Sequence, residues 1–362
     1  MAILFDNEAR TYDALLVVSY GGPEAPEEVM PFLDRVLAGR PVPEARKLEV
    51  AEHYLHFGGV SPIQQQTRDL IAALDADLRG AGLGLPIYWG NRNWHPLLPD
   101  TLRQMRDDGI ERAICFVTVA YSSYSGCRQY RENLAAARAE VGEGAPELDK
   151  LRVFYNHPGF VEPQVDLVRE ALATLPDATR EGAEIVFTTH SIPHTMSRHC
   201  DYEAQHYETC RLVMERLAAA EGGSRAWQLV YNSRSGPEFI PWLEPDVGDH
   251  LRERHEAGVP GVVVVPVGFV SDHMEVVYDL DVEAKEIADE LGLPFARAGT
   301  VGVDERFVRM IRELVLERHE GAPPRALGTR GPNWDACPMD CCLTPGQPER
   351  PTVASAPPRG RP

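Results

Sequence analysis

The stretch DALLVVSYGGPEAP, residues 13–26, joins an apolar run to a turn that is rich in Gly and Pro. An apolar run without alternation is typical of a strand that is buried on both faces of a sheet. The segment EEVMPFLDRVLAG, residues 27–39, follows it and has the spacing of an amphipathic helix. This unit of strand, turn and helix sets a pattern that we expect the rest of the chain to repeat.

Further apolar runs are expected to be strands that alternate with helical segments. They lie at 85–91, 112–121, 151–157, 184–190, 226–236 and 261–270. Strands that alternate with helices predict a parallel sheet with helices on both faces. We therefore expect an α/β protein with two doubly wound, Rossmann-like halves, over residues 1–160 and 161–321. A tail rich in Pro, Gly and Arg follows over residues 322–362.

The composition restricts the class of protein. The hydrophobic fraction of 43% and the charged fraction of 25% are those of a soluble globular chain. A formal net charge of -19 argues against a nucleic-acid backbone or an anionic membrane surface as the main partner. The sequence contains no membrane-length apolar run, and its amino terminus does not resemble a secretory signal. We therefore expect a cytoplasmic protein, and a monomer.

Two predicted strands end in the same layout. Tyr20 and His190 each follow an apolar run, and each is followed three residues later by a proline. In open parallel sheets, ligands bind outside the carboxyl ends of the strands. If the two halves pack with these ends facing, Tyr20 and His190 point into one cleft. The alternative is that both are ordinary strand-end residues, held by the backbone.

A third strand end carries a row of carboxylates. In VPVGFVSDHMEVVYDLDVEA, residues 265–284, Glu275, Asp279 and Glu283 recur at the i, i+4 and i+8 spacing of one helix face. We expect this helix to begin with Ser271 or Asp272 as its N-cap. A row that accepts protons or conducts cations is one interpretation, and a solvated acidic face is the other. The valines and leucine among the acids favour a partly buried helix, in which carboxylates need a cation, a base or protonation.

Four motifs together resemble the ferrochelatases, the enzymes that insert ferrous iron into a porphyrin. In chain order they are GGVSPI (58–63), FTTHSIPHTM (187–196), YNSRSGPEFIPWLEPD (231–246) and GFVSDHMEVVYDLDVEA (268–284). The resemblance extends from about residue 13 to 320. It implies two Rossmann-like halves with a porphyrin cleft between them, in agreement with the fold expected from the strands and helices.

The resemblance also implies roles for individual residues. His190 becomes the catalytic histidine on one side of the porphyrin plane, and Glu275 becomes its carboxylate partner. Asp279 and Glu283 continue an acidic row that is associated with metal or proton traffic, so these four residues are the expected contacts of the iron substrate.

Porphyrin contacts are expected on the opposite wall. Ser61 lies in the loop that helps to hold the porphyrin, and Tyr20 lies on the face opposite His190. Arg40 is one of several arginines that suit propionates through bidentate hydrogen bonds, although each of them could equally be a surface residue. Tyr130 is a further candidate. The number of residues in the loop around Cys127, however, differs by about one from that in related enzymes that have no iron–sulfur cluster.

Tyr20 favours one substrate over another. A tyrosine at this position resembles the Gram-positive enzymes that metallate coproporphyrin III, a porphyrin polar enough to be handled in the cytosol. Enzymes of other lineages that act on protoporphyrin IX tend to have Met there, and protoporphyrin IX stays open as the alternative substrate. A cobalt chelatase resembles the chain less closely. A non-catalytic porphyrin or haem carrier would not need the acidic row.

The cysteines complete the resemblance. The motif CPMDCC supplies Cys337, Cys341 and Cys342, and the loop SYSGCRQY supplies Cys127. The set resembles the actinobacterial branch, which carries a [2Fe–2S] cluster, and four thiolates are the usual ligands of such a cluster. A structural zinc site is an alternative, but zinc favours paired cysteine modules, and Cys127 has no such mate. Unliganded thiols on a flexible tail are the third possibility.

Overall fold

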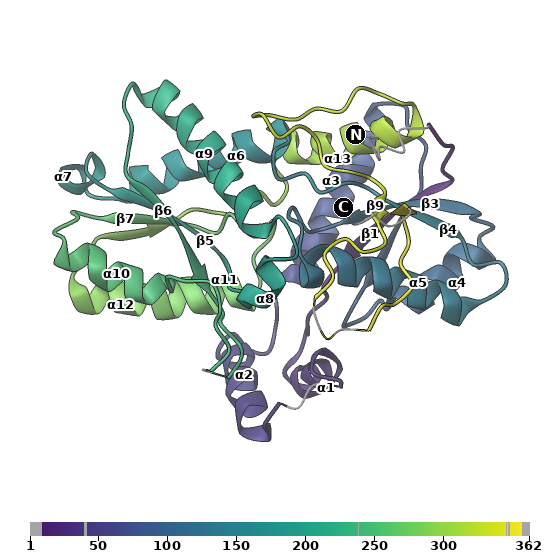
Figure 1. Cartoon of the computed structure of the whole chain (residues 1–362), viewed down its shortest axis with the longest axis horizontal. Helices are drawn as coiled ribbons and strands as arrows, with labels where there is room; N and C mark the ends of the chain where they lie inside the picture. The colour runs from purple at the N-terminus through teal and green to yellow at the C-terminus, as the bar shows by residue number, and fades with distance from the viewer. Residues whose placement is uncertain (1–8, 40–41, 238, 345, 347, 357–362) are drawn as a thin grey trace.

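The computed structural model describes residues 9–39, 42–237, 239–344, 346 and 348–356 of the 362. Two parallel sheets of four strands each lie side by side (Figure 1). The first has the order β2-β1-β3-β4, with β1 (Ala14–Ser19), β2 (Ile87–Asn91), β3 (Arg112–Val117) and β4 (Glu147–Lys150). The second has the order β6-β5-β7-β8, with β5 (Glu184–His190), β6 (Trp227–Asn232), β7 (Val262–Val265) and β8 (Phe295–Arg297). The predicted doubly wound α/β fold is confirmed.

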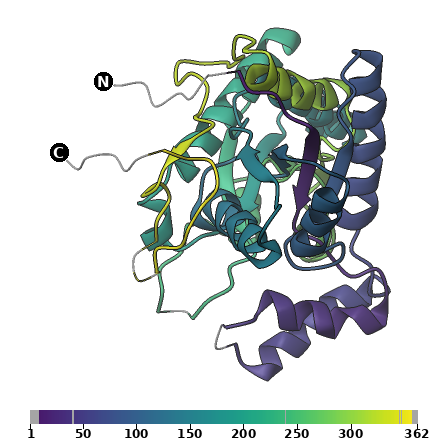
Figure 2. The same ribbon diagram turned by 90° about the vertical axis from the view of Figure 1, so that its right-hand side faces the viewer.

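Helices cover both faces of the first sheet because its central strand is apolar on both sides. Leu16 of β1 packs with helices α4 (Leu98–Asp107) and α5 (Gln129–Val141), and Leu15 faces α3 (Ile63–Gly80) and α13 (Glu305–His319). All six residues of β1 are buried, as an interior parallel strand requires. Helices α1 (Pro26–Val36) and α2 (Glu44–His56) project from one end of the molecule (Figures 1 and 2).

The second sheet is covered in the same way. One face packs against α10 (Val247–Glu256), α11 (Met274–Tyr278), the π-helix η2 (Asp279–Ala284) and α12 (Lys285–Leu291). The other face packs against α6 (Pro158–Thr174) and α9 (Tyr202–Glu221). Two short helices, α7 (Asp177–Arg180) and α8 (His194–Ser197), follow α6 and β5. The acidic row of the sequence therefore lies on a helix packed against the second sheet.

One continuous core joins the halves. It contains Phe116 of β3, Phe187 of β5 and Phe307 of α13, all fully buried. Polar bonds add to it: the Tyr121 hydroxyl donates to the Val267 carbonyl at 3.0 Å, and the Ser122 amide donates to the Gln205 side chain at 2.7 Å. Helix α13 packs on α3 of the first half as well as on α6 of the second half. The packing therefore shows no sharp domain boundary at residue 160 or 321. Those boundaries stay predictions.

The predicted strand over 151–157 is wrong. The edge strand is the preceding polar segment Glu147–Lys150, which pairs with Arg112–Cys115 of β3. An edge strand has only one strand neighbour, so polar residues are tolerated there and the apolar signal is weak. The residues after it are buried because the chain crosses into the core toward α6, without strand pairing.

The predicted start of the acidic helix is also wrong. The helix begins at Met274, so His273 and not Ser271 or Asp272 directly precedes its first residue. The Asp272 carboxylate accepts a hydrogen bond from Arg297 at 3.1 Å. Strand β7 ends at Val265 because Pro266 has no N–H to donate to a sheet.

The tail is fixed to the body rather than structureless. It contains two short paired segments, β9 (Cys337–Pro338) and β10 (Ser355–Ala356). The Asn156 side chain donates to the carbonyls of Leu327 at 3.3 Å and Gly331 at 2.8 Å. In the part of the chain that the structure describes, no helix is long and apolar enough to cross a membrane.

Acidification is expected to destabilise the fold through His206 of α9. The imidazole is fully buried, stacks on Tyr121 and donates from Nδ1 to the Tyr202 carbonyl at 2.7 Å. Burial lowers the pKa of His206 to about 3. Below pH about 6.5 the unfolded chain binds a proton there that the folded chain excludes, so stability is full above that pH and falls as the pH falls. Between pH 7 and 5 we expect a loss of about 2 kcal/mol in the free energy of unfolding, measured with urea.

His206→Gln is the matched variant for this prediction. It removes the titrating group, so its free energy of unfolding is expected to change less between pH 7 and 5 than that of the wild type. Equal slopes for the two proteins would assign the acid sensitivity to other groups.

Candidate active site

His190 lies at the carboxyl end of β5, where a parallel sheet presents its side chains to ligands. It is half-buried, and its Nδ1 contacts the Ser191 carbonyl. The Tyr202 hydroxyl donates to the His190 carbonyl at 2.8 Å and lies 2.7 Å from the Thr189 hydroxyl. Helix α9 therefore holds the backbone of the predicted catalytic histidine through Tyr202.

Asp279 lies next to the end of β6, the strand that pairs with β5. Its carboxylate accepts hydrogen bonds from the Asn232 amide at 3.1 Å and from the Ser233 hydroxyl. Asn232 is the register partner of His190 across β5 and β6. Ser233 has a φ of 60°, the left-handed conformation that a non-glycine residue rarely adopts and that is common at functional sites. Sequence analysis assigned no role to Asn232 or Ser233, although they lie in the motif YNSRSGPEFIPWLEPD that supports the resemblance.

Glu283 continues the row along the π-helix η2. Burial raises the pKa of Glu283, and the neighbouring Asp246 carboxylate raises it further, while Arg46 lowers it. Asp281, between the predicted residues, instead pairs with Arg297 at 2.7 Å. Because η2 is π-helical, its hydrogen bonds run from i to i+5, so the row is not the regular α-helical stack that the sequence predicts. Glu275 lies in α11, and its side chain is outside the described part of the structure.

Two of the predicted porphyrin residues, Tyr20 and Tyr130, lie beside Arg92, which follows β2. The Arg92 guanidinium lies 5.9 Å from the centre of the Tyr20 ring and 5.5 Å from that of Tyr130. Both distances are within the range of cation–π attraction. The structure thus brings two predicted porphyrin residues together on one cation. Arg92 was missed, and the motif NRNWHP at the end of a predicted strand was the available signal.

Ser61 supports the loop that carries Tyr20. Its amide donates to the Pro23 carbonyl at 2.9 Å, and its side chain is buried. A Cβ atom at Gly22 would lie 2.7 Å from the Ser61 Cβ, so only glycine allows this approach. The motifs GGPEAP and GGVSPI therefore pack directly on each other. Arg40 lies outside the described residues.

Contacts between the halves join these walls. The Gln66 side chain of α3 accepts a hydrogen bond at 2.8 Å from the amide of Asp272, just before α11. The Ser125 hydroxyl contacts the Met196 sulfur at 3.8 Å, six residues beyond His190. On the outer side, His53 of α2 stacks on Tyr278 of α11 with ring centres 3.7 Å apart. The Tyr20 side and the His190 side are thus linked at several points.

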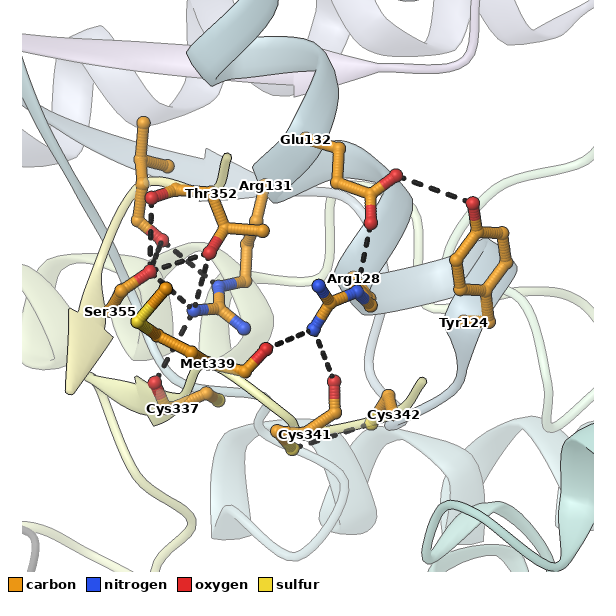
Figure 3. Close-up of polar contacts among 11 residues, drawn as sticks. Tyr124, Arg128, Arg131, Glu132, Cys337, Met339, Cys341, Cys342, Thr352 and Ser355 are labelled. Atoms are coloured by element: carbon orange, nitrogen blue, oxygen red, sulfur yellow. Dashed lines mark hydrogen bonds and ion pairs between the residues drawn. The ribbon is translucent and has the colours of Figure 1, made fainter. Parts of the chain in front are cut away.

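The four predicted cluster cysteines lie near one another, and Figure 3 shows the three that belong to the tail, Cys337, Cys341 and Cys342. Cys127, in the π-helix η1 (Tyr124–Arg128), is close enough to Cys337 for each thiol to affect the pKa of the other, and Cys337 affects Cys341 in the same way. The sulfurs of Cys341 and Cys342 are 3.5 Å apart. The neighbouring Cys337 thiol, and burial after it, raise the pKa of the Cys127 thiol well above its usual value. Even so, among the described residues no three or more His, Cys, Asp or Glu side chains are grouped so as to hold a metal ion.

Two buried arginines hold the cysteine tail against α5. Arg128 donates to the carbonyls of Met339 at 2.6 Å and Cys341 at 2.9 Å, and it pairs with Glu132 at 2.8 Å (Figure 3). Arg131 donates to the carbonyls of Val353 at 3.0 Å and Cys337 at 3.3 Å. Neither arginine was predicted to have a role from the sequence. Arg128 and Arg131 thus hold the tail close to Cys127, although each arginine is 206 or more residues away in the chain from the tail carbonyls that it binds.

Comparison with known proteins agrees with this architecture. Residues 12–319 match the family model Ferrochelatase. A protein of Streptomyces coelicolor (strain ATCC BAA-471 / A3(2) / M145) named Coproporphyrin III ferrochelatase is 53% identical, over 96% of this chain and 97% of its own length. A Ferrochelatase of Rhodopirellula baltica (strain DSM 10527 / NCIMB 13988 / SH1) is 52% identical, over 98% of this chain and 99% of its own. The solved structure of SirB from Bacillus subtilis with Fe³⁺ has a TM-score of 0.53 at 12% identity, over 85% of this chain and 97% of that one, and shares the fold. The chain belongs to the ferrochelatase family.

Proposed function

We propose that this protein inserts ferrous iron into coproporphyrin III to give coproheme. As a ferrochelatase it is an enzyme, a metal chelatase of the lyase class, whose substrates are iron and a porphyrin. The observation that carries the proposal is that Asn232, the register partner of His190 at the carboxyl ends of β5 and β6, donates a hydrogen bond to the Asp279 carboxylate at 3.1 Å. Relatives that are 53% and 54% identical and named Coproporphyrin III ferrochelatase support the choice of porphyrin. A cytoplasmic location is part of the proposal, since a porphyrin with four propionates is polar enough for water.

Metal insertion releases two pyrrole protons as Fe²⁺ binds the ring nitrogens. His190 is proposed to accept these protons, because imidazole titrates near neutral pH, and to approach the iron as a ligand. Glu275 is proposed as its carboxylate partner. Asp279 and Glu283 are proposed to pass protons or cations along the row. The raised pKa of Glu283 suits proton transfer, since its carboxylate takes up a proton more readily than an exposed one.

The porphyrin is proposed to lie against the wall formed by Tyr20, Arg92 and Tyr130. Arg92 supplies a guanidinium between the two rings, a group that binds carboxylates in a bidentate manner. Ser61 is proposed to hold the Tyr20 loop in place for this contact. Arg40 is kept as a proposed propionate ligand from the sequence alone.

We also propose that Cys127, Cys337, Cys341 and Cys342 hold a [2Fe–2S] cluster. Four cysteine thiols that lie near one another are the donor set that such a cluster uses. When bound, the cluster would supply a one-electron redox centre beside α5.

The substrate proposal predicts a preference that can be measured by porphyrin absorbance. Under anaerobic conditions with Fe²⁺, kcat/KM for coproporphyrin III is expected to exceed that for protoporphyrin IX by about tenfold or more. The additional propionates can bond to the protein, and one hydrogen bond to a charged group contributes about 1.5–3 kcal/mol. A higher value for protoporphyrin IX would reverse the substrate assignment. Porphyrin binding without metal insertion would indicate a carrier, and faster insertion of Co²⁺ would indicate a cobalt chelatase.

A further inference from the structure

Helices α1 and α2 form a pair that projects from one end of the molecule (Figures 1 and 2). Phe32 of α1 packs on Tyr54 of α2 with ring centres 5.7 Å apart, and Lys47 of α2 pairs with Asp34 of α1 at 2.5 Å. Among the described residues of α2, Ala51 alone is buried. A helix that buries so little of its surface takes its position from a few side-chain contacts with its neighbours.

The helix pair is anchored to the first half next to Tyr20. Phe32 meets the Tyr20 ring at an angle of 70° with ring centres 6.3 Å apart, and it meets the Trp94 ring at 6.1 Å. The Trp94 indole also donates to the Glu28 carboxylate of α1 at 2.9 Å. Because these ring distances are those of favourable edge-to-face pairs, Phe32 helps to orient Tyr20. A change in the position of the helix pair therefore changes the support of Tyr20.

His53 anchors the same helix pair to the second half. Its imidazole lies flat on the Tyr278 ring, with ring centres 3.7 Å apart and 9° between the ring planes. His56, three residues further along α2, meets the Tyr278 ring edge-on with centres 6.1 Å apart. Tyr278 is the last residue of α11, and Asp279 follows it as the first residue of η2. The stack thus joins the helix pair to the start of the acidic row.

We propose that His53 is a positioning residue for porphyrin binding: through Tyr278 it holds the helix pair, and with it Tyr20, against the second half. The porphyrin of the proposed function lies between the Tyr20 side and the His190 side, so this inference rests on that function. A helix pair that is fixed at both ends keeps the two sides at one spacing before the porphyrin binds. Such preorganisation lowers the entropic cost of binding.

The groups proposed for the chemistry have supports of their own within the second half. The Tyr202 hydroxyl donates to the His190 carbonyl at 2.8 Å, and Asn232 donates to the Asp279 carboxylate at 3.1 Å. Neither bond involves α2. Loss of the stack is therefore expected to weaken porphyrin binding and to leave the chemical step nearly unchanged. In kinetic terms, KM for the porphyrin rises while kcat stays close to its wild-type value.

The test is anaerobic metallation of coproporphyrin III with Fe²⁺ by the full chain, followed by absorbance. His53→Ala is expected to raise KM for the porphyrin about fivefold, in the range that the loss of one aromatic pair gives, with kcat within about twofold of the wild type. His53→Phe keeps a ring that can stack on Tyr278, and it is expected to stay near the wild type. Glu52→Gln is the matched control, because Glu52 is the exposed neighbour of His53 on the same helix.

Tyr278→Leu tests the other side of the stack. It is expected to raise KM as His53→Ala does, and the double variant is expected to be no worse than either single variant, because both substitutions remove the same contact. Additive effects on KM overturn the inference. An unchanged KM in His53→Ala also overturns it, and so does a fall in kcat at constant KM, which indicates a smaller amount of folded enzyme. Both side chains are only partly buried, so the variants are expected to fold, and urea unfolding checks this. If His53→Ala unfolds, Tyr278→Leu decides by the same criteria.

Porphyrin binding separates this inference from the proposed function. The dissociation constant for coproporphyrin III, measured by quenching of tryptophan fluorescence, is expected to rise about fivefold in His53→Ala whether or not iron is inserted. A wild type that binds this porphyrin but inserts no iron overturns the proposed function alone, and the dissociation constants then decide the inference. A wild type that binds no porphyrin overturns both.

Discussion

His190→Ala is expected to abolish iron insertion, with kcat reduced about 10³-fold. The substitution removes the group proposed to accept the pyrrole protons and to approach the iron, while the β5 backbone stays fixed by the Tyr202 hydroxyl. Anaerobic metallation of coproporphyrin III, followed by absorbance, measures the loss. Since the chemistry and not porphyrin contact is removed, the dissociation constant for the porphyrin is expected to change only a few-fold.

His199→Ala is the control for this experiment. His199 is exposed, follows helix α8 on the same connection, and bonds through Nδ1 to the Thr195 carbonyl at 2.8 Å. Its variant is expected to retain wild-type kcat. Normal metallation by a folded His190→Ala protein would refute the proposed role of His190. Equal losses in both variants would point to disruption of the whole connection.

Cys342→Ser is expected to remove the cluster, leaving iron and acid-labile sulfide near zero and the protein colourless. A serine oxygen is a harder and poorer ligand for iron in such a cluster than a thiolate. Cys342 is 5% exposed and has a φ of 55°, so serine fits the same space and backbone without a new clash. Iron and sulfide assays and the visible spectrum provide the measurement.

Cys200 offers a matched control for the ligand assignment. Its thiol is near enough to Cys342 to raise the pKa of that thiol, but it bonds to the carbonyls of Met196 and Ser197 instead. Cys200→Ser is therefore expected to keep a full complement of iron and sulfide. The opposite pattern, loss in Cys200→Ser and retention in Cys342→Ser, would show that the ligand set is wrong.

The sequence was most informative where one local pattern decides the structure. The unbroken apolar run of β1 predicted both a strand and its central place in a parallel sheet. Only a strand that is covered on both faces of the sheet needs apolar residues at every position. The weakest strand signal belongs to β4, whose sequence ELDK is polar because it forms an edge. The residues His190 and Asp279 followed from strand ends and helical spacing combined with the family motifs.

The partners of the predicted residues could not be found in this way. Asn232 and Ser233 hold Asp279 from 47 and 46 residues away, and nothing in a local pattern encodes that bond. Arg92 between two tyrosine rings depends on how two loops approach each other. The bonds of Arg131 to the tail depend on the path of the whole tail, which carries hardly any regular structure of its own.

The π-helix η1 has a genetic consequence. Its hydrogen bonds close from i to i+5, so a turn of Tyr124–Arg128 encloses one residue more than a turn of the α-helix that continues it from Gln129. An insertion of one codon in an ancestral α-helix would produce such a turn, and deletion of one codon would restore the regular helix with α5 unchanged. A lineage could thus gain or lose the position of Cys127 in one mutational step, without disturbing Tyr130 and the porphyrin wall.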